Sequence, residues 1–228
     1  MAPMTFFENS HYVPIYCDLR DKKVVVAGGG QVAERKVRAL LTSGAKIVII
    51  SPDVTDGLRQ IIRQKKVQHL KRPFEQGDLE NAWLVIAATD DRNVQELVFQ
   101  EAQEQRCFCN VVDEPDRCSF IVPSQVKRGA LSISISTGGQ SPALSKALRK
   151  KLEEQFGNEW ALYVEIIGKL RRFILENIPP EDVSAKLKRL VCMECLEWIR
   201  NKEWEKLCLW ATDICGHAGE QIVREVIS

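Results

Sequence analysis

The stretch "KVVVAGGGQVAERKVRALLTSGAKIVIISPD", residues 23–53, most constrains the fold. A short apolar run leads directly into three glycines, a helix-patterned segment follows, and a second apolar run ends on an acid. Two strands joined through a helix must pair in parallel, because the crossover between parallel strands needs about a dozen residues. The stretch therefore predicts a strand–helix–strand unit.

The same alternation continues to residue 112. Apolar runs predict further strands at 67–70, 83–88 and 107–112, and helical patterns predict helices at 54–65 and 93–105. Right-handed crossovers between successive parallel strands give an α/β fold with a Rossmann-like, doubly wound parallel sheet. We expect this domain to occupy residues 1–122.

The glycine loop predicts a dinucleotide site. Gly28, Gly30 and Ala33 form G-x-G-x-x-A, in which the first glycine permits a tight turn, the second admits a pyrophosphate and the small alanine permits close packing. The helix that follows offers free N–H groups to an anion. Asp53 ends the second strand region, about 20 residues after the motif, where a carboxylate favours the ribose of NAD over that of NADP. A purely steric reason for the glycines is the alternative.

Polar residues also follow the strand predicted at 83–88. Thr89, Asp90 and Asp91 would lie at the carboxyl end of the sheet, where ligands of such folds bind. Either aspartate would equally serve as the cap of the next helix, and the two roles are compatible.

Beyond residue 112 the pattern changes. Leu131, Ile133 and Ile135 alternate with serines and predict a half-polar strand, which needs a partner for its apolar face. Ser141 and Pro142 then predict the cap and first position of a basic helix, whose charges we interpret as a solvated face rather than an anion-binding surface.

Composition excludes several classes of protein. A net charge of +1 with 28% charged residues gives no field for nucleic acid or a membrane surface. No apolar run approaches the roughly 20 residues of a spanning helix, and the first residues lack a signal-peptide pattern. These features predict a cytoplasmic protein, in which the eight cysteines are reduced thiols.

The last third of the sequence is helical in pattern. Trp160, Val164 and Ile167 would share one face, continued by Arg171 or Ile174. It also holds "CMEC", which could be a soft metal site together with Cys208, Cys215 and His217. Since no second CxxC follows, we favour buried helical thiols, with Cys192 and Cys195 on one helix face, and predict no metal site.

Four segments carry a resemblance to a known family: "GGGQVAERK" (28–36), "AATDD" (87–91), "FCNVVDEPDRCSFIVPS" (108–124) and "STGGQSPALSKALRKKLE" (136–153). In order and spacing they resemble the precorrin-2 dehydrogenase and sirohydrochlorin ferrochelatase family, the siroheme synthase N-terminal module, over roughly residues 12–152. The resemblance implies a dimerisation region at 123–153, a homodimer, and a helical domain at 154–228. It also implies NAD-dependent oxidation of precorrin-2 to sirohydrochlorin, with ferrous iron as a further substrate in bifunctional members.

The resemblance also implies site residues. We expect cofactor contacts from the three sheet-edge loops and substrate contacts further along, namely Gly28, Gly30, Gln31, Val32, Ser51, Pro52, Asp53, Thr89 and Asp90 for NAD, and Asn110, Ser136, Thr137 and Gly138 for the tetrapyrrole. Asp113 is the implied catalytic residue, and its place after the last strand suits a general base. Stabilisation of a turn before Glu114 and Pro115 is the alternative. Thr137 stands where many relatives have serine.

Two other functions remain open. The same fold could serve as a non-catalytic NAD-sensing regulatory domain, against which Asp113 and the loop at 136–141 argue. A tetrapyrrole-binding chelatase without redox activity is disfavoured by the intact glycine loop and by Asp53.

Overall fold

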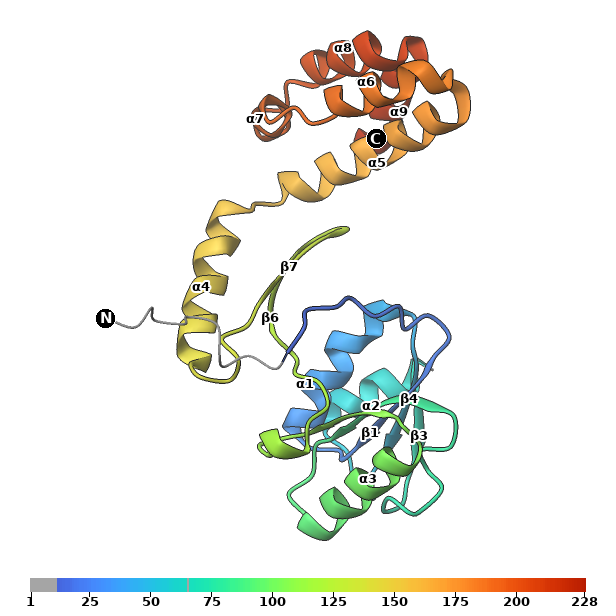
Figure 1. Ribbon diagram of the computed structural model, residues 1–228, viewed down its shortest axis with the longest axis vertical. Helices are drawn as coiled ribbons and strands as arrows, with labels where there is room; N and C mark the ends of the chain where they lie inside the picture. Colours follow the sequence, from blue (N-terminus) through green and yellow to red (C-terminus); the bar gives the residue numbers. More distant parts are fainter. Residues whose placement is uncertain (1–11, 65) are drawn as a thin grey trace, which may run out of the picture. The chain divides into compact units, whose positions relative to one another are not determined.

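The computed structural model describes residues 12–64 and 66–228 (Figure 1). The chain divides into two compact units between Val122 and Pro123, and each is described by itself. Within the described residues, no helix combines the length and the apolar character needed to cross a bilayer. The further boundary at 153/154 stays a prediction.

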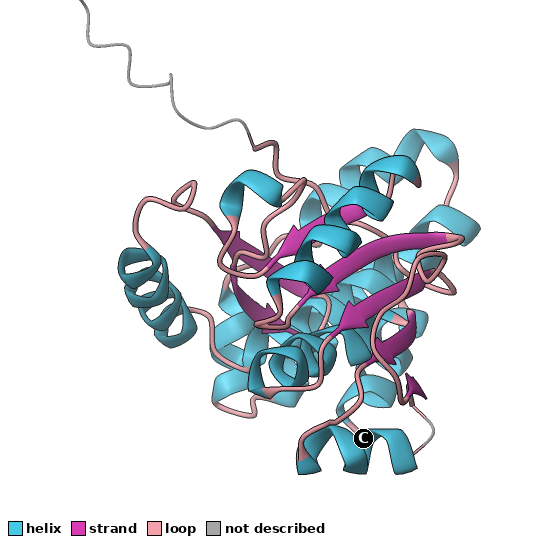
Figure 2. Cartoon of the chain, turned by 90° about the horizontal axis from the view of Figure 1, so that it is seen from below, coloured by secondary structure: helices cyan, strands magenta, loops and turns pink. Residues whose placement is uncertain are grey.

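The first unit is built on five parallel strands, which can be followed in Figure 2. Their order is β3-β2-β1-β4-β5, with parallel pairing throughout. The chain order reverses between β1 and β4, which is the switch point where ligands of such sheets bind. The predicted doubly wound sheet is confirmed, with strands β1 (Lys23–Ala27), β2 (Lys46–Ile50), β3 (Gln68–Leu70), β4 (Ala82–Ala87) and β5 (Phe108–Val111).

Helices cover both faces of this sheet. Helices α1 (Gln31–Leu40) and α2 (Asp56–Arg63) bury apolar side chains against one face, and α3 (Arg92–Glu104) covers the other. Because β1 is covered on both sides, Val24, Val25 and Val26 are fully buried, which explains the continuous apolar run. Most strand and helix bounds lie within one or two residues of the sequence prediction. The helical pattern after the glycines, which extends to residue 43, gives way to a short 3-10 helix, η1 (Leu41–Ser43), and α2 starts later than predicted because Thr55 caps it.

The second unit begins with an antiparallel hairpin of β6 (Ser124–Arg128) and β7 (Leu131–Ile135), followed by α4 (Pro142–Gln155). Strand β7 is confirmed, whereas β6 was not predicted, because Val126 is its only apolar side chain. The Ser141 hydroxyl accepts the N–H of Leu144 at 3.2 Å and confirms the predicted cap. The side chain of Arg128 donates to the carbonyls of Phe156 and Glu153, which ties the hairpin to the end of α4.

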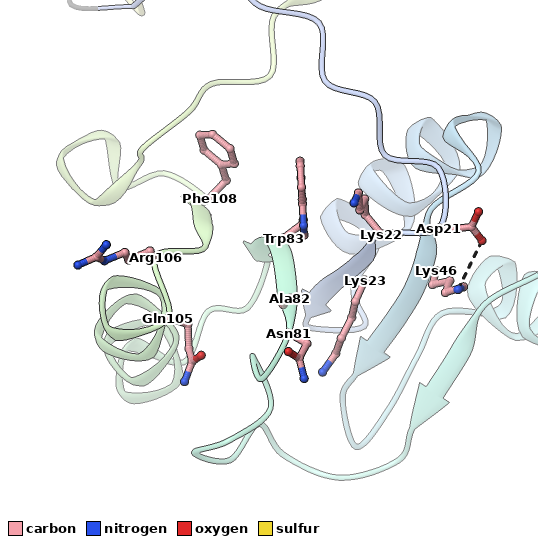
Figure 3. Close-up of a pocket in the computed structure, with 10 residues that line it drawn as sticks. All are labelled: Asp21, Lys22, Lys23, Lys46, Asn81, Ala82, Trp83, Gln105, Arg106 and Phe108. Carbon is pink, nitrogen blue, oxygen red and sulfur yellow. Dashed lines mark ion pairs between the residues drawn. The ribbon is translucent and has the colours of Figure 1, made fainter.

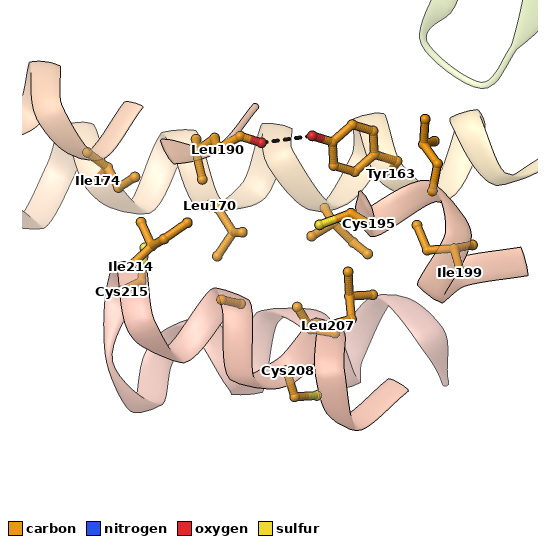
Figure 4. Close-up of a cluster of buried hydrophobic side chains, with 14 residues drawn as sticks. Tyr163, Leu170, Ile174, Leu190, Cys195, Ile199, Leu207, Cys208, Ile214 and Cys215 are labelled. Carbon is orange, nitrogen blue, oxygen red and sulfur yellow. Dashed lines mark hydrogen bonds between the residues drawn. The ribbon is translucent and has the colours of Figure 1, made fainter. Parts of the chain in front are cut away.

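The remaining helices enclose a separate core (Figure 4). They are α5 (Glu159–Asn177), α6 (Pro180–Arg189), α7 (Glu194–Arg200), α8 (Trp204–Cys215) and α9 (His217–Ile227). The predicted face of α5 was wrong except for Ile174: the buried stripe is Tyr163, Ile166, Leu170 and Ile174. Trp160 and Ile167 only pack against its edge. The observed residues recur every three or four positions and so form one face of the helix.

The cysteines of this core are packing residues. Cys195, Cys208 and Cys215 are buried, and burial raises the pKa of each thiol, so they stay protonated rather than becoming thiolate ligands. Cys192 precedes α7, so the expectation that it shares a helix face with Cys195 was wrong. Within the described residues, no group of three or more His, Cys, Asp or Glu side chains is placed to hold a metal ion.

Candidate active site

The glycine loop after β1 lies against the end of β4. Gly28 has φ +123°, and a Cβ at this position would lie 2.0 Å from the carbonyl oxygen of Ala88. Its N–H donates to the carbonyl of Ile50 at 2.9 Å, so the loop is held against the ends of both neighbouring strands. Glycine is therefore required here by conformation and by space.

Gly29 has a role that the motif did not reveal. A Cβ here would lie 1.9 Å from the carbonyl oxygen of Asp53, and the carbonyl of Gly29 accepts the N–H of Thr55 at 3.0 Å. The glycine loop and the loop after β2 thus pack backbone to backbone. The sequence gives little sign that glycine is required at position 29, because the backbone it contacts lies in a different loop.

Gly30 differs from both neighbours. Its backbone is extended (φ −80°, ψ −171°), and a Cβ here would have no atom within 4 Å. Gly30 is the N-cap of α1, and no side chain caps the helix, so no side chain competes with a ligand for its first N–H groups. Gln31 is exposed and Val32 half-buried beside them, while Ala33 is fully buried, as close packing requires. An uncapped, open helix N-terminus is suited to binding a pyrophosphate.

Glu34, the acid in the first turn of α1, makes hydrogen bonds and an ion pair within the protein. The Thr55 hydroxyl donates to Glu34 at 2.5 Å, and Arg38 pairs with the same carboxylate at 2.6 Å. These two partners, Thr55 first, hold the pKa of Glu34 below its usual value. Glu34 therefore links α1 to the start of α2.

The loop after β2 presents Asp53 to solvent. The buried Ser51 hydroxyl donates to the carbonyl of Asp53 at 2.7 Å, and the Ser51 carbonyl lies 2.9 Å from Nε2 of His69. Pro52 and Asp53 are exposed, and the Asp53 carboxylate bonds to no other described residue. The loop is fixed through its backbone, while the carboxylate is free to accept hydrogen bonds from a ligand.

The loop after β4 separates the two aspartates. Asp91 accepts the N–H of Asn93 at 2.9 Å and caps α3, which settles the capping role in its favour. Thr89 is held by its hydroxyl, which accepts the N–H of Asp91, and by its carbonyl, which accepts from Gln95. Asp90 is exposed at the same sheet edge, and its carboxylate has no hydrogen bond or ion pair with a described residue.

Asp113 lies at the tip of a tight turn after β5. Its φ is +64°, a left-handed conformation that Asp and Asn tolerate better than most residues, and Glu114 closes the turn by donating to Val111. The N–H of Val112 donates to Ala87 at 3.0 Å, so the turn flanks the same strand end as the glycine loop. The Asp113 side chain is exposed. The turn and an exposed carboxylate coexist in one residue.

Cys118 and Asn110 make hydrogen bonds to the chain on either side of this turn. The Cys118 thiol lies 3.2 Å from the carbonyl of Val111 and 3.3 Å from that of Glu114. The buried amide of Asn110 donates to the carbonyl of Phe120 at 3.0 Å. Its NH₂ group is thus used within the fold, and Asn110 positions the chain around Asp113.

Lys36 is a residue that the sequence did not single out. It is half-buried on α1, close enough to interact electrostatically with Asp113 and Cys118. Burial, followed by neighbouring Arg35, lowers the pKa of its ammonium, and Cys118 and Asp113 partly offset that effect. Lys36 therefore places a positive charge beside the Asp113 turn.

The remaining predicted contacts lie in the second unit. The Ser136 hydroxyl accepts the N–H of Gly138 at 3.1 Å, and Gly138 has φ +62°. Thr137 accepts the N–H of Ser141 and lies 3.2 Å from the Ser145 hydroxyl. The Thr137 hydroxyl therefore shapes the loop, a role that serine would equally fill.

Comparisons with known proteins agree with this architecture. Residues 15–124 match the family described as "Putative NAD(P)-binding", and residues 128–155 match "Sirohaem biosynthesis protein central". A solved structure titled "SirC, precorrin-2 dehydrogenase" has a TM-score of 0.71 and 24% identity, covering 83% of this chain and all of that one. At this identity the likeness establishes the fold.

Curated relatives extend the match. Siroheme synthase 3 of Aeromonas hydrophila is 42% identical over 160 residues, which cover 70% of this chain and 34% of the relative. Siroheme synthase 2 of Pectobacterium atrosepticum is 38% identical over 196 residues, which cover 86% of this chain and 39% of the relative. This chain thus spans little more than a third of the relatives it matches.

The fold and the glycine loop define a Rossmann-like NAD(P)-binding protein. The matches narrow this class further. The chain is related to the siroheme synthases, and the resemblance to their N-terminal module is confirmed.

Proposed function

We propose that this chain catalyses the NAD-dependent oxidation of precorrin-2 to sirohydrochlorin in siroheme biosynthesis. The observation that carries the proposal is one sheet edge, where the open N-terminus of α1 and the exposed Asp113 flank the end of β4. The choice of substrate rests on the names of the siroheme synthase relatives and of the precorrin-2 dehydrogenase with a similar fold.

The residues at this edge fit a dinucleotide. The space above Gly30 leaves room for a pyrophosphate on α1, with Gly28, Gln31 and Val32 beside it. Asp53, supported by Ser51 and Pro52, would accept hydrogen bonds from the adenosine ribose and disfavour a 2′-phosphate, so we assign NAD rather than NADP. The bound nicotinamide supplies a hydride acceptor, near which Thr89 and Asp90 would lie.

Asp113 would act as the general base. Oxidation of the macrocycle removes a hydride and a proton, and an exposed carboxylate next to Lys36 is suited to accept that proton. Ser136, Thr137 and Gly138 stay our proposed tetrapyrrole contacts. Insertion of ferrous iron into the product is a second proposed step, because the same carboxylate could accept the displaced pyrrole protons.

We further propose a cytoplasmic homodimer that forms through residues 123–153. Two observations favour this region. The β6–β7 hairpin has only two strands, and such hairpins are marginally stable alone. Helix α4 also leaves Leu144 50% and Leu148 39% exposed, one turn apart. A monomer in sedimentation at micromolar concentration would contradict the dimer.

The decisive experiment supplies precorrin-2 and NAD, follows NADH by absorbance, and then adds ferrous iron. We expect NADH to form in proportion to the precorrin-2 consumed, followed by the siroheme spectrum. If NAD binds without turnover, the chain is a regulatory domain. If sirohydrochlorin is metallated but precorrin-2 is not oxidised, it is a chelatase without redox activity.

A further inference from the structure

A cavity of about 740 Å³ opens at the amino ends of β1, β2, β4 and β5 (Figure 3). The glycine loop lies at the other end of β1, roughly 16 Å away for a strand of five residues. The cavity is therefore separate from the candidate active site. Its volume is typical of sites for small molecules, which range over about 300–1,000 Å³.

Two aromatic rings are exposed in this cavity. Trp83 is 45% and Phe108 41% exposed, and Figure 3 shows both rings rising on the same side of the sheet edge. Trp83 owes its position to an irregularity in β4, because Lys23 pairs with Ala82 while Val24 pairs with Leu84. The extra residue re-aims its side chain, as bulges do. The result is an aromatic surface to which a flat ring can stack.

Basic side chains surround these rings. Lys22 lies over Trp83, with Nζ 4.4 Å from the ring centroid, and Lys46 makes only an exposed ion pair with Asp21 at 3.4 Å. Arg106 makes no ion pair with any described residue. Lys23 differs, because its ammonium donates to two backbone carbonyls. With Lys23 included, four cations and one carboxylate leave an excess of positive charge beside the aromatic rings.

We propose that this cavity binds a planar aromatic anion, a molecule whose ring stacks on Trp83 and whose acid groups pair with Lys22, Lys46 and Arg106. A neutral aromatic ring would leave the excess positive charge without a counter-ion, and an aliphatic anion would leave the exposed parts of the Trp83 and Phe108 rings uncovered. The cavity combines both features, so it selects for a ligand that has both. This second site is independent of the proposed oxidation.

The test is calorimetric titration of the whole chain with naphthalene-2,6-dicarboxylate, with cyclohexane-1,4-dicarboxylate as the non-aromatic control. We expect saturable binding with a Kd of about 1 mM or tighter, and binding of the control about tenfold weaker. Trp83→Ala and Lys22→Ala should each raise the Kd about tenfold. Lys71→Ala, an exposed lysine outside the cavity, should leave it unchanged.

The proposal would be overturned by a lack of saturable binding up to about 10 mM, or by the same Kd in Trp83→Ala as in the parent chain. Displacement of the probe by NAD would also overturn it, because the probe would then bind at the glycine loop. Thermal unfolding of each variant shows whether it is folded. Trp83→Phe serves as a second variant that keeps a ring and should retain most of the affinity.

Discussion

The two edges of the parallel sheet are built in different ways. At the carboxyl edge, loops pack backbone to backbone: Gly28 against Ala88, and Gly29 against Asp53. At the amino edge, side chains make the surface, with Trp83 and Phe108 exposed among lysines and arginine. At the first edge, positions where backbones touch, such as Gly28 and Gly29, admit only glycine, whereas the second edge depends on which side chains meet there. Substitutions at the first edge should therefore be costly in ways that depend sharply on position.

The largest effect is expected at Gly28. Gly28→Ala adds a Cβ that would lie 2.0 Å from a carbonyl oxygen, on a backbone with φ +123°. We expect the free energy of unfolding to fall by about 3 kcal/mol or more, because strain and overlap add. Gly77→Ala is the matched control: φ is +99°, but nothing lies within 4 Å, so strain alone should cost about 1–2 kcal/mol. Urea denaturation compares the two, and equal losses would show that the contact with Ala88 is unimportant.

Gly30→Val should separate binding from folding. The backbone at Gly30 is extended and its Cβ position is open, so valine fits the unliganded protein. The branched side chain would occupy the space that we assign to the pyrophosphate, and we expect NAD binding to be abolished with little change in the urea midpoint. Normal NAD affinity in this variant would mean that the loop is only structural.

Asp113→Asn tests the proposed base with the turn preserved. Asparagine tolerates φ +64° as well as aspartate does, whereas alanine would also strain the turn. We expect turnover to fall by about 10²-fold or more, with NAD affinity unchanged. The matched control is Asp116→Asn, an exposed acid of the adjoining 3-10 helix η2 (Pro115–Arg117), which should keep full turnover. Siroheme formation should fall too if one carboxylate serves both steps, and full activity would redirect attention to Asp90.

The same contrast explains what could be predicted from sequence. The strands of the sheet, the tight turn at Gly28 and the Ser141 cap follow from local patterns, because each signal lies within a few residues of its structural effect. Asp113 both lies in a tight turn and exposes its carboxylate. The residue type alone could not show that the two features occur together.

The missed features share a cause. The contact of Gly29 with Asp53 and the proximity of Lys36 to Asp113 join segments that are distant in sequence. Strand β6 has one buried apolar residue, Val126, so its pairing with β7 rather than its own pattern determines its structure. The cavity at the amino edge also has no motif, since its side chains come from four strands and the turns between them.

The smallest effect is expected at Asp53, whose backbone and side chain have different roles. Its carbonyl accepts from Ser51 and lies against Gly29, while its exposed carboxylate bonds to no described residue. Asp53→Ala keeps the backbone contacts and removes only the carboxylate, so stability should change by less than about 0.5 kcal/mol. We expect NAD to bind about tenfold more weakly, the effect of losing roughly one good hydrogen bond to a charged group. NADP should bind more tightly than before, because the repulsion of its 2′-phosphate is lost. Titration of both dinucleotides measures the ratio of the two dissociation constants, with the exposed Asp56→Ala as control. An unchanged ratio would remove Asp53 from the ribose site and leave the choice between NAD and NADP to another residue of the same edge.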